Sequence, residues 1–66
     1  MPVVQVNLWK GIDQEKIEYV IKNITKVFVD MGIPADAVTV IVHSIPKEHW
    51  GEGGETCDVR FKDIEP

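Results

Sequence analysis

The sequence has little of what usually stabilises or targets a very small protein. One cysteine, Cys57, excludes an internal disulfide. His43, His49 and Cys57 lie too far apart to form the short ligand pairs from which zinc sites are built, so no metal is expected. No apolar run approaches the roughly 18 residues that span a bilayer. The N-terminus lacks the basic flank and cleavage site of a signal peptide, which predicts a cytoplasmic protein.

Positive charge is also scarce. Arg60 is the single arginine, and the formal net charge is −4. Nucleic acids and anionic membrane surfaces are bound through clustered Lys and Arg. Both are therefore excluded as the main partner.

The length limits the architecture to one domain, residues 1–66. A domain of about 60 residues buries only about 60% of its unfolded surface. Its stability is therefore marginal without a disulfide or a bound metal. With neither disulfide nor metal expected, the remaining source of stability is association. We expect a homo-oligomer.

The apolar pattern predicts an α+β fold with a short β-α-β unit. Residues 3–8 alternate as a strand does, and residues 38–45 are β-branched and apolar on both sides, as in a covered strand. Between them, apolar residues recur at steps of three and four over about residues 14–31, with Asp13 as N-cap and Gly32 as C-cap. A right-handed crossover makes the two strands parallel.

The C-terminal quarter predicts a β-hairpin. Pro46 ends the second strand, and Gly51, Gly53 and Gly54 supply a tight turn. A last short strand is expected from the alternating apolar residues Cys57, Val59 and Phe61. This hairpin has little core of its own and is expected to pack on a neighbouring chain. Cys57 is expected to be an inert core thiol.

Pro2 is the residue whose chemistry could support catalysis. Met1 is normally removed before a small residue, which would expose a secondary amine at the start of a strand. Apolar surroundings lower the pKa of an amine, and an amine near neutrality can act as a general base. On the residues alone, a proline that merely protects the terminus is the simpler alternative.

The chain resembles the 4-oxalocrotonate tautomerase family over residues 2 to about 54. The resemblance rests on the Pro2–Leu8 strand followed by Gly11, on the amphipathic helix, and on the segment Lys47-Glu48-His49-Trp50-Gly51-Glu52-Gly53-Gly54. It implies a hexameric, cofactor-independent enzyme that moves a proton in a small enol or keto acid, with the active site completed across subunits. Pro2 would be the catalytic base, and Trp50 would help form the apolar pocket around it.

The sequence departs from the family at the two arginines that bind the substrate carboxylate and polarise its carbonyl. Ile12 and Thr39 stand there, and neither supplies a bidentate cation. We expect substrate contacts from Trp50, Leu8, Ile12, Thr39 and Arg60. The alternative function is a non-catalytic oligomeric scaffold or binding protein that keeps the fold.

Overall fold

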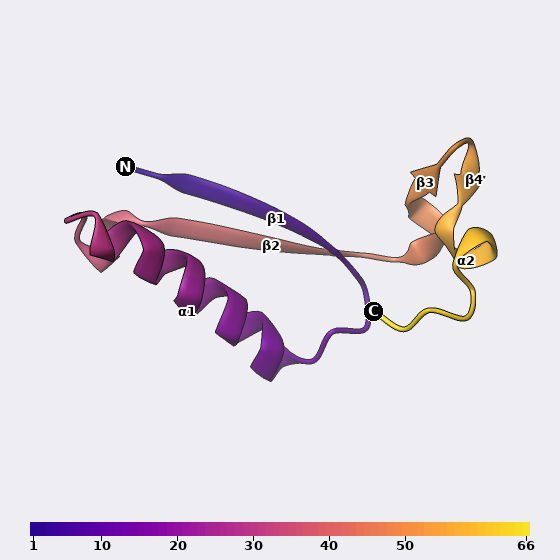
Figure 1. The fold of residues 1–66 in the computed structure, drawn as a ribbon, viewed down its shortest axis with the longest axis horizontal. Coiled ribbons are helices and arrows are strands. Elements are labelled where there is room, and N and C mark those ends of the chain that lie inside the picture. The colour runs from indigo at the N-terminus through magenta and orange to yellow at the C-terminus, as the bar shows by residue number, and fades with distance from the viewer.

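The computed structural model describes all 66 residues. Two parallel strands, β1 (Val3–Trp9) and β2 (Thr39–Ile45), run side by side with the helix α1 (Gln14–Asp30) along one of their faces (Figure 1). A small C-terminal unit lies beyond the far end of the strands. α1, the longest helix, has neither the length nor the apolar run that a membrane span requires.

The β-α-β unit confirms the predicted fold. The strands pair in parallel register from Val3 opposite Thr39 to Trp9 opposite Ile45. The ladder extends by one hydrogen bond at each end, from Thr39 N to Pro2 O at 3.0 Å and from Lys10 N to Ile45 O at 2.8 Å. Each strand lies within one residue of its predicted bounds.

The helix begins and ends where its capping residues predict. Asp13 accepts a hydrogen bond from Lys16 N at 2.9 Å, which satisfies one of the free amides of the first turn. The last turn closes at Gly32, whose φ of +94° is the left-handed conformation that glycine adopts without a Cβ clash. The expected span of 14–31 is confirmed to within one residue.

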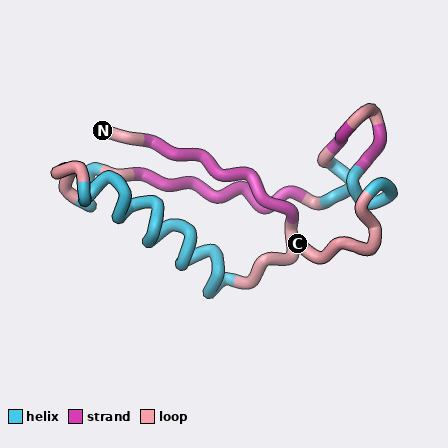
Figure 2. The backbone as a smooth tube through the Cα atoms, in the orientation of Figure 1, coloured by secondary structure: helices cyan, strands magenta, loops and turns pink.

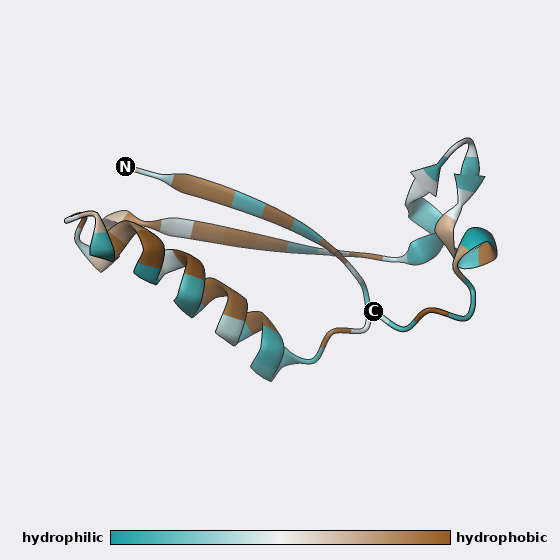
Figure 3. Cartoon of the chain, in the orientation of Figure 1, coloured by the Kyte–Doolittle hydropathy of each residue, from teal (hydrophilic) through white to brown (hydrophobic).

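The apolar stripe of α1 faces the sheet (Figure 3). Val27 and Met31 were expected on this face but are 57% and 69% exposed. A sheet of two strands is too narrow to cover the whole stripe, so its margin stays in solvent. The sheet's other face is open as well, with Val3 at 62% and Ile41 at 38% exposure.

The C-terminal unit contains the predicted hairpin. β3 (Gly51–Glu52) pairs antiparallel with β4 (Glu55–Thr56). The turn between them is Gly53-Gly54, with φ of +63° and +87°. Positive φ at both central residues is the requirement of a tight type I′ turn, which the glycines meet. A short 3₁₀ helix, η2 (Lys47–His49), connects β2 to this hairpin, as η1 (Ala35–Ala37) connects α1 to β2.

The expected last strand through Cys57, Val59 and Phe61 is wrong. Residues Cys57–Arg60 form a helical turn, α2, closed by a hydrogen bond from Phe61 N to Cys57 O at 2.9 Å. Cys57 and Phe61 are four residues apart, and this spacing fits one face of a helical turn as well as alternate positions of a strand. Cys57 is fully buried, as expected for a core thiol, and it is the one fully buried residue of the chain.

Beyond α2 the chain turns back. Figure 2 shows this last loop running from the C-terminal unit toward the end of β1, where the C-terminus lies. Pro66 contacts Gly11 there so closely that a Cβ on Gly11 would lie 2.6 Å from Pro66 Cγ. Glycine at position 11 therefore permits this return.

Candidate functional site

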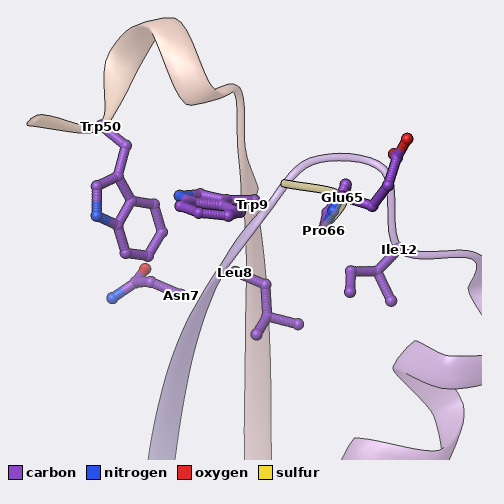
Figure 4. A pocket seen from close by; sticks show the side chains of 7 residues that line it. All are labelled: Asn7, Leu8, Trp9, Ile12, Trp50, Glu65 and Pro66. Carbon is purple, nitrogen blue, oxygen red and sulfur yellow. The ribbon is translucent and has the colours of Figure 1, made fainter. Parts of the chain in front are cut away.

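A pocket of about 310 Å³ lies where the end of β1 meets the C-terminal unit. Its lining comes from the end of β1, the following loop, the residue before β3 and the end of the chain: Asn7, Leu8, Trp9, Ile12, Trp50, Glu65 and Pro66 (Figure 4). Apolar side chains dominate. Glu65 is the one ionisable side chain in this lining.

Trp9 is the centre of the pocket wall. Its ring packs edge-on against Trp50, with centroids 6.2 Å apart and an interplanar angle of 78°. On another side it contacts Phe61 at 5.7 Å. Such aromatic pairs add about 0.5–1.5 kcal/mol each beyond the area they bury. The Trp9 Nε1 is buried and has no hydrogen-bond partner.

Lys47 fixes the end of the chain against this wall. Its ammonium donates to Phe61 O at 2.9 Å and to Ile64 O, and it lies 4.7 Å from the centroid of the Trp9 ring. A charged donor shared between two carbonyls and an aromatic face is a strong, directional anchor. These contacts engage the Lys47 hydrogens within the chain, so Lys47 is not free to pair with a substrate carboxylate.

The pocket gathers three of the expected site residues. Leu8, Ile12 and Trp50 line it together, although they come from three segments of the chain. Sequence reasoning did not identify Trp9 or the C-terminal residues Glu65 and Pro66. Trp9 lies next to Leu8 in a strand, so alternation assigns it to the opposite face. Because β1 ends at Trp9, the Trp9 ring packs against the C-terminal unit instead.

Pro2 and Thr39 lie together at the opposite end of the strands. Thr39 N donates to Pro2 O at 3.0 Å, and Pro2 is half-buried. The six residue steps from Pro2 to Leu8, at roughly 3.3 Å each, place this end about 20 Å from the pocket. One chain therefore does not bring Pro2 and Trp50 together.

Arg60 lies outside the pocket as well. Its guanidinium is directed at the hairpin, with Nη1 3.4 Å from Glu52 O and 3.8 Å from the Glu55 carboxylate. The ion pair is largely exposed, and such pairs contribute little to stability.

Two further polar groups have defined environments. On the open sheet face, His43 Nδ1 and Asn7 Oδ1 are 3.0 Å apart across the paired strands. Burial raises the pKa of the Cys57 thiol, and the negative charge of Glu52 adds to this effect. A raised pKa keeps the thiol protonated, which disfavours a nucleophilic role.

Comparison with known proteins identifies the class. Residues 2–60 match the tautomerase family, described as "Tautomerase enzyme". The chain belongs to this family. It is 36% identical over 55 residues to the 2-hydroxymuconate tautomerase of Comamonas testosteroni, covering 82% of this chain and 87% of the relative.

Solved structures agree with the fold. TomN, a 4-oxalocrotonate tautomerase homologue in the tomaymycin biosynthetic pathway, superposes with a TM-score of 0.86 at 29% identity, over 92% of this chain and 95% of TomN. A 4-oxalocrotonate tautomerase isozyme from Methylibium petroleiphilum gives 0.80 at 34% identity, over 86% and 94%. The expected relationship and fold are thus confirmed, and family membership supports a tautomerase or related isomerase activity.

Proposed function

We propose that this protein is a cofactor-independent tautomerase in which the Pro2 amine, freed by removal of Met1, moves a proton within a small enol or keto acid. The neutral amine takes the enol O–H proton, and the ammonium so formed returns a proton to the conjugated carbon. No redox step and no external proton donor is needed. The amine is neutral again at the end of the cycle.

The setting of Pro2 supports this role. Met1 is 94% exposed, so a processing enzyme can reach it. The hydrogen bond from Thr39 N holds the Pro2 carbonyl at the edge of the sheet, which fixes the direction of the amine. Pro2 is half-buried in one chain, and further burial in an assembly would lower the pKa of its amine by disfavouring the charged form.

The separation between Pro2 and the aromatic pocket is the observation that carries the proposal. The two ends of the site lie on opposite ends of one pair of strands, about 20 Å apart. The sheet face between them is uncovered and bears Val3 and Ile41. A second copy running antiparallel on this sheet would bring its pocket to the Pro2 of the first.

We therefore propose a homo-oligomer whose sites are completed across subunits, with the hexamer as the order that the family resemblance implies. Light scattering or sedimentation tests this, and the expected species is several times 7.5 kDa. A stable monomer at micromolar concentration would leave Pro2 without its pocket and would contradict the mechanism.

The charge of the pocket lining indicates the class of substrate. Relatives are named for 2-hydroxymuconate, a dicarboxylate, but the pocket in this chain has no Lys or Arg in its lining. Ile12 contributes an apolar wall instead of a cation. We propose a monoanionic keto-enol acid with an apolar or aryl end, of the phenylpyruvate type, with that end in the pocket.

The decisive experiment combines intact mass spectrometry with kinetics. The mass should correspond to the chain without Met1, and ketonisation of enol-phenylpyruvate should fall by at least about 10²-fold in Pro2→Ala. Pro34→Ala, in the loop before η1, is the matched proline control and should retain full activity. A retained Met1 acylates the amine and would refute the role of Pro2.

The alternative is a non-catalytic oligomeric scaffold or binding protein. The absence of cations at positions 12 and 39 favours it, because substrate activation by arginine is not available. Under this alternative the wild type and Pro2→Ala would show the same background rate while ligand binding persists.

A further inference from the structure

Two of the last six residues line the pocket, although all six lie beyond the part of the chain that matches the family. The match ends at residue 60. The following segment, residues 61–66, is called the tail here. It supplies Glu65 and Pro66 to the pocket lining and leads the chain back to the end of β1 (Figures 2 and 4).

We propose that the tail is a specificity-determining wall of the substrate pocket, and that Glu65 makes this wall select an uncharged, apolar substrate end over a carboxylate. The inference rests on the proposed function in assigning the pocket to substrate. The position of the tail and its charge rest on contacts within the chain.

Two sets of contacts, at Lys47 and at Gly11, hold the tail against the rest of the chain. Lys47 donates to the carbonyls of Phe61 and Ile64, at either side of the tail's single turn. That turn is closed by a hydrogen bond from Ile64 N to Phe61 O at 3.0 Å. At its end, Pro66 packs on Gly11, where the missing Cβ allows the approach. A segment fixed at both ends forms a wall, not a free terminus.

The tail also sets the charge of the pocket. Glu65 brings the one ionisable side chain of the lining, and Asn7 is the one other polar side chain. The nearby cation, Lys47, is already shared between two carbonyls and the Trp9 ring. A substrate carboxylate bound near the tail would approach this like charge, and the lining holds no Lys or Arg to offset it.

The chemical class of the ligand end follows. The apolar part of the pocket lining consists of two indole rings, Leu8, Ile12 and Pro66. These groups suit a flat apolar or aryl group by stacking and area burial. The single anion of the substrate would then lie away from the tail. An oxidised or carboxylated version of the same group would be rejected.

Binding can be measured without turnover, because both tryptophans of the chain, Trp9 and Trp50, line the pocket. Sorbate and trans,trans-muconate are matched probes: one end of the same dienoic acid carries a methyl group or a second carboxylate. Titration of the full oligomeric protein by tryptophan fluorescence at low salt gives both dissociation constants. Sorbate should bind at least about tenfold more tightly than muconate.

Two pairs of variants separate the effect of the Lys47 hydrogen bonds from the effect of the Glu65 charge. Lys47→Met should weaken sorbate binding by about fivefold because the tail is released, whereas Lys62→Met, an exposed tail lysine, should change it by less than twofold. Glu65→Gln should reduce the preference for sorbate by about threefold. Asp63→Asn, in the same tail but outside the pocket, should leave that preference unchanged.

A chain ending at Asp63 serves as a second test if Lys47→Met fails to fold, since it removes the wall and keeps Lys47. It should show the same roughly threefold reduction in the preference for sorbate as Glu65→Gln and should also bind sorbate more weakly. Unchanged affinity and preference in this shortened chain and in Glu65→Gln would overturn the inference. Altered binding in a protein without proton transfer would support the wall and refute only the catalytic proposal.

Discussion

Trp9 links the β-α-β unit to the C-terminal unit, and its truncation is the sharpest test of how the pocket is built. Trp9→Ala removes two aromatic pairs, with Trp50 and Phe61, and the cation-π contact with Lys47. Replacing a fully buried Trp by Ala costs about 3–5 kcal/mol. Because Trp9 is only half-buried, we expect a loss of about 2–3 kcal/mol in the free energy of unfolding.

Trp9→Phe distinguishes packing from hydrogen bonding. This change keeps a ring against Trp50 and removes the indole N–H, which is buried without a partner. An unsatisfied buried donor costs about 1–3 kcal/mol, which offsets the smaller ring's loss of contact area. Trp9→Phe should therefore lie within about 1 kcal/mol of wild type.

The assay is urea unfolding at one fixed protein concentration, since association contributes to apparent stability. With a slope near 1 kcal/mol per molar urea, Trp9→Ala should lower the midpoint by about 2–3 M. Tyr19→Ala, at a 69% exposed helix position, is the control and should stay within about 0.5 kcal/mol. A Trp9→Ala midpoint equal to that of Tyr19→Ala would show that Trp9 does not hold the two units together.

Two further predictions concern single residues outside the pocket. Asp13→Ala should destabilise the protein by about 1 kcal/mol because Lys16 N loses its acceptor, while Asp13→Asn should retain most of the stability in the same unfolding assay. For Cys57, the folded pKa is raised above the unfolded one, so the unfolded state releases the thiol proton first as pH rises. The contribution of Cys57 to stability is thus fully present below the pKa of the thiol in the unfolded chain and is lost as pH rises through the folded pKa. The unfolding free energy of wild type should fall more steeply above the unfolded pKa than that of Cys57→Ala, and parallel curves would contradict this.

The β-α-β unit could be predicted from sequence because local signals and tertiary packing agree there. The period of three and four, Asp13 at the N-cap and Gly32 at the C-cap all specify the same helix, and the structure has it to within one residue. The type I′ turn at Gly53-Gly54 was equally accessible, since only glycine readily adopts positive φ at both positions.

The segment after the hairpin could not be predicted in the same way. Cys57, Val59 and Phe61 satisfy a strand pattern, but β3 pairs with only two residues of β4, so no ladder continues. The chain instead closes a helical turn through the hydrogen bond from Phe61 N to Cys57 O, with Cys57 fully buried. Likewise, nothing in the sequence near Glu65 indicates that it lines a pocket together with Leu8, because the position of the tail depends on the hydrogen bonds from Lys47.

The expected site residues lie in two groups at opposite ends of the paired strands. Leu8, Ile12 and Trp50 line one pocket within a single chain. Pro2 and Thr39 also meet, but at the other end of the sheet. The family resemblance treats both groups as one site, and in physical terms that requires an antiparallel neighbour.

Under the proposed function, substrate choice would depend on positions 12 and 39, which lie in these two separate groups. A charge-assisted hydrogen bond to a carboxylate contributes about 1.5–3 kcal/mol, so the lack of two corresponds to about 10²–10⁴ in rate or affinity. The wild type should therefore turn over 2-hydroxymuconate poorly and enol-phenylpyruvate well.

Restoring cations tests this reasoning at each end. Ile12→Arg adds a guanidinium to the pocket, and Thr39→Arg adds one beside Pro2 on the exposed sheet face. If the two ends form one site across subunits, the double variant should gain at least about tenfold in kcat/KM on 2-hydroxymuconate, and more than either single variant. Ile12→Met is the volume-matched control and should leave the dicarboxylate rate unchanged. Equal, Pro2-dependent rates of the wild type on both substrates would refute the argument, since a cation from elsewhere in the assembly would then be filling the missing role.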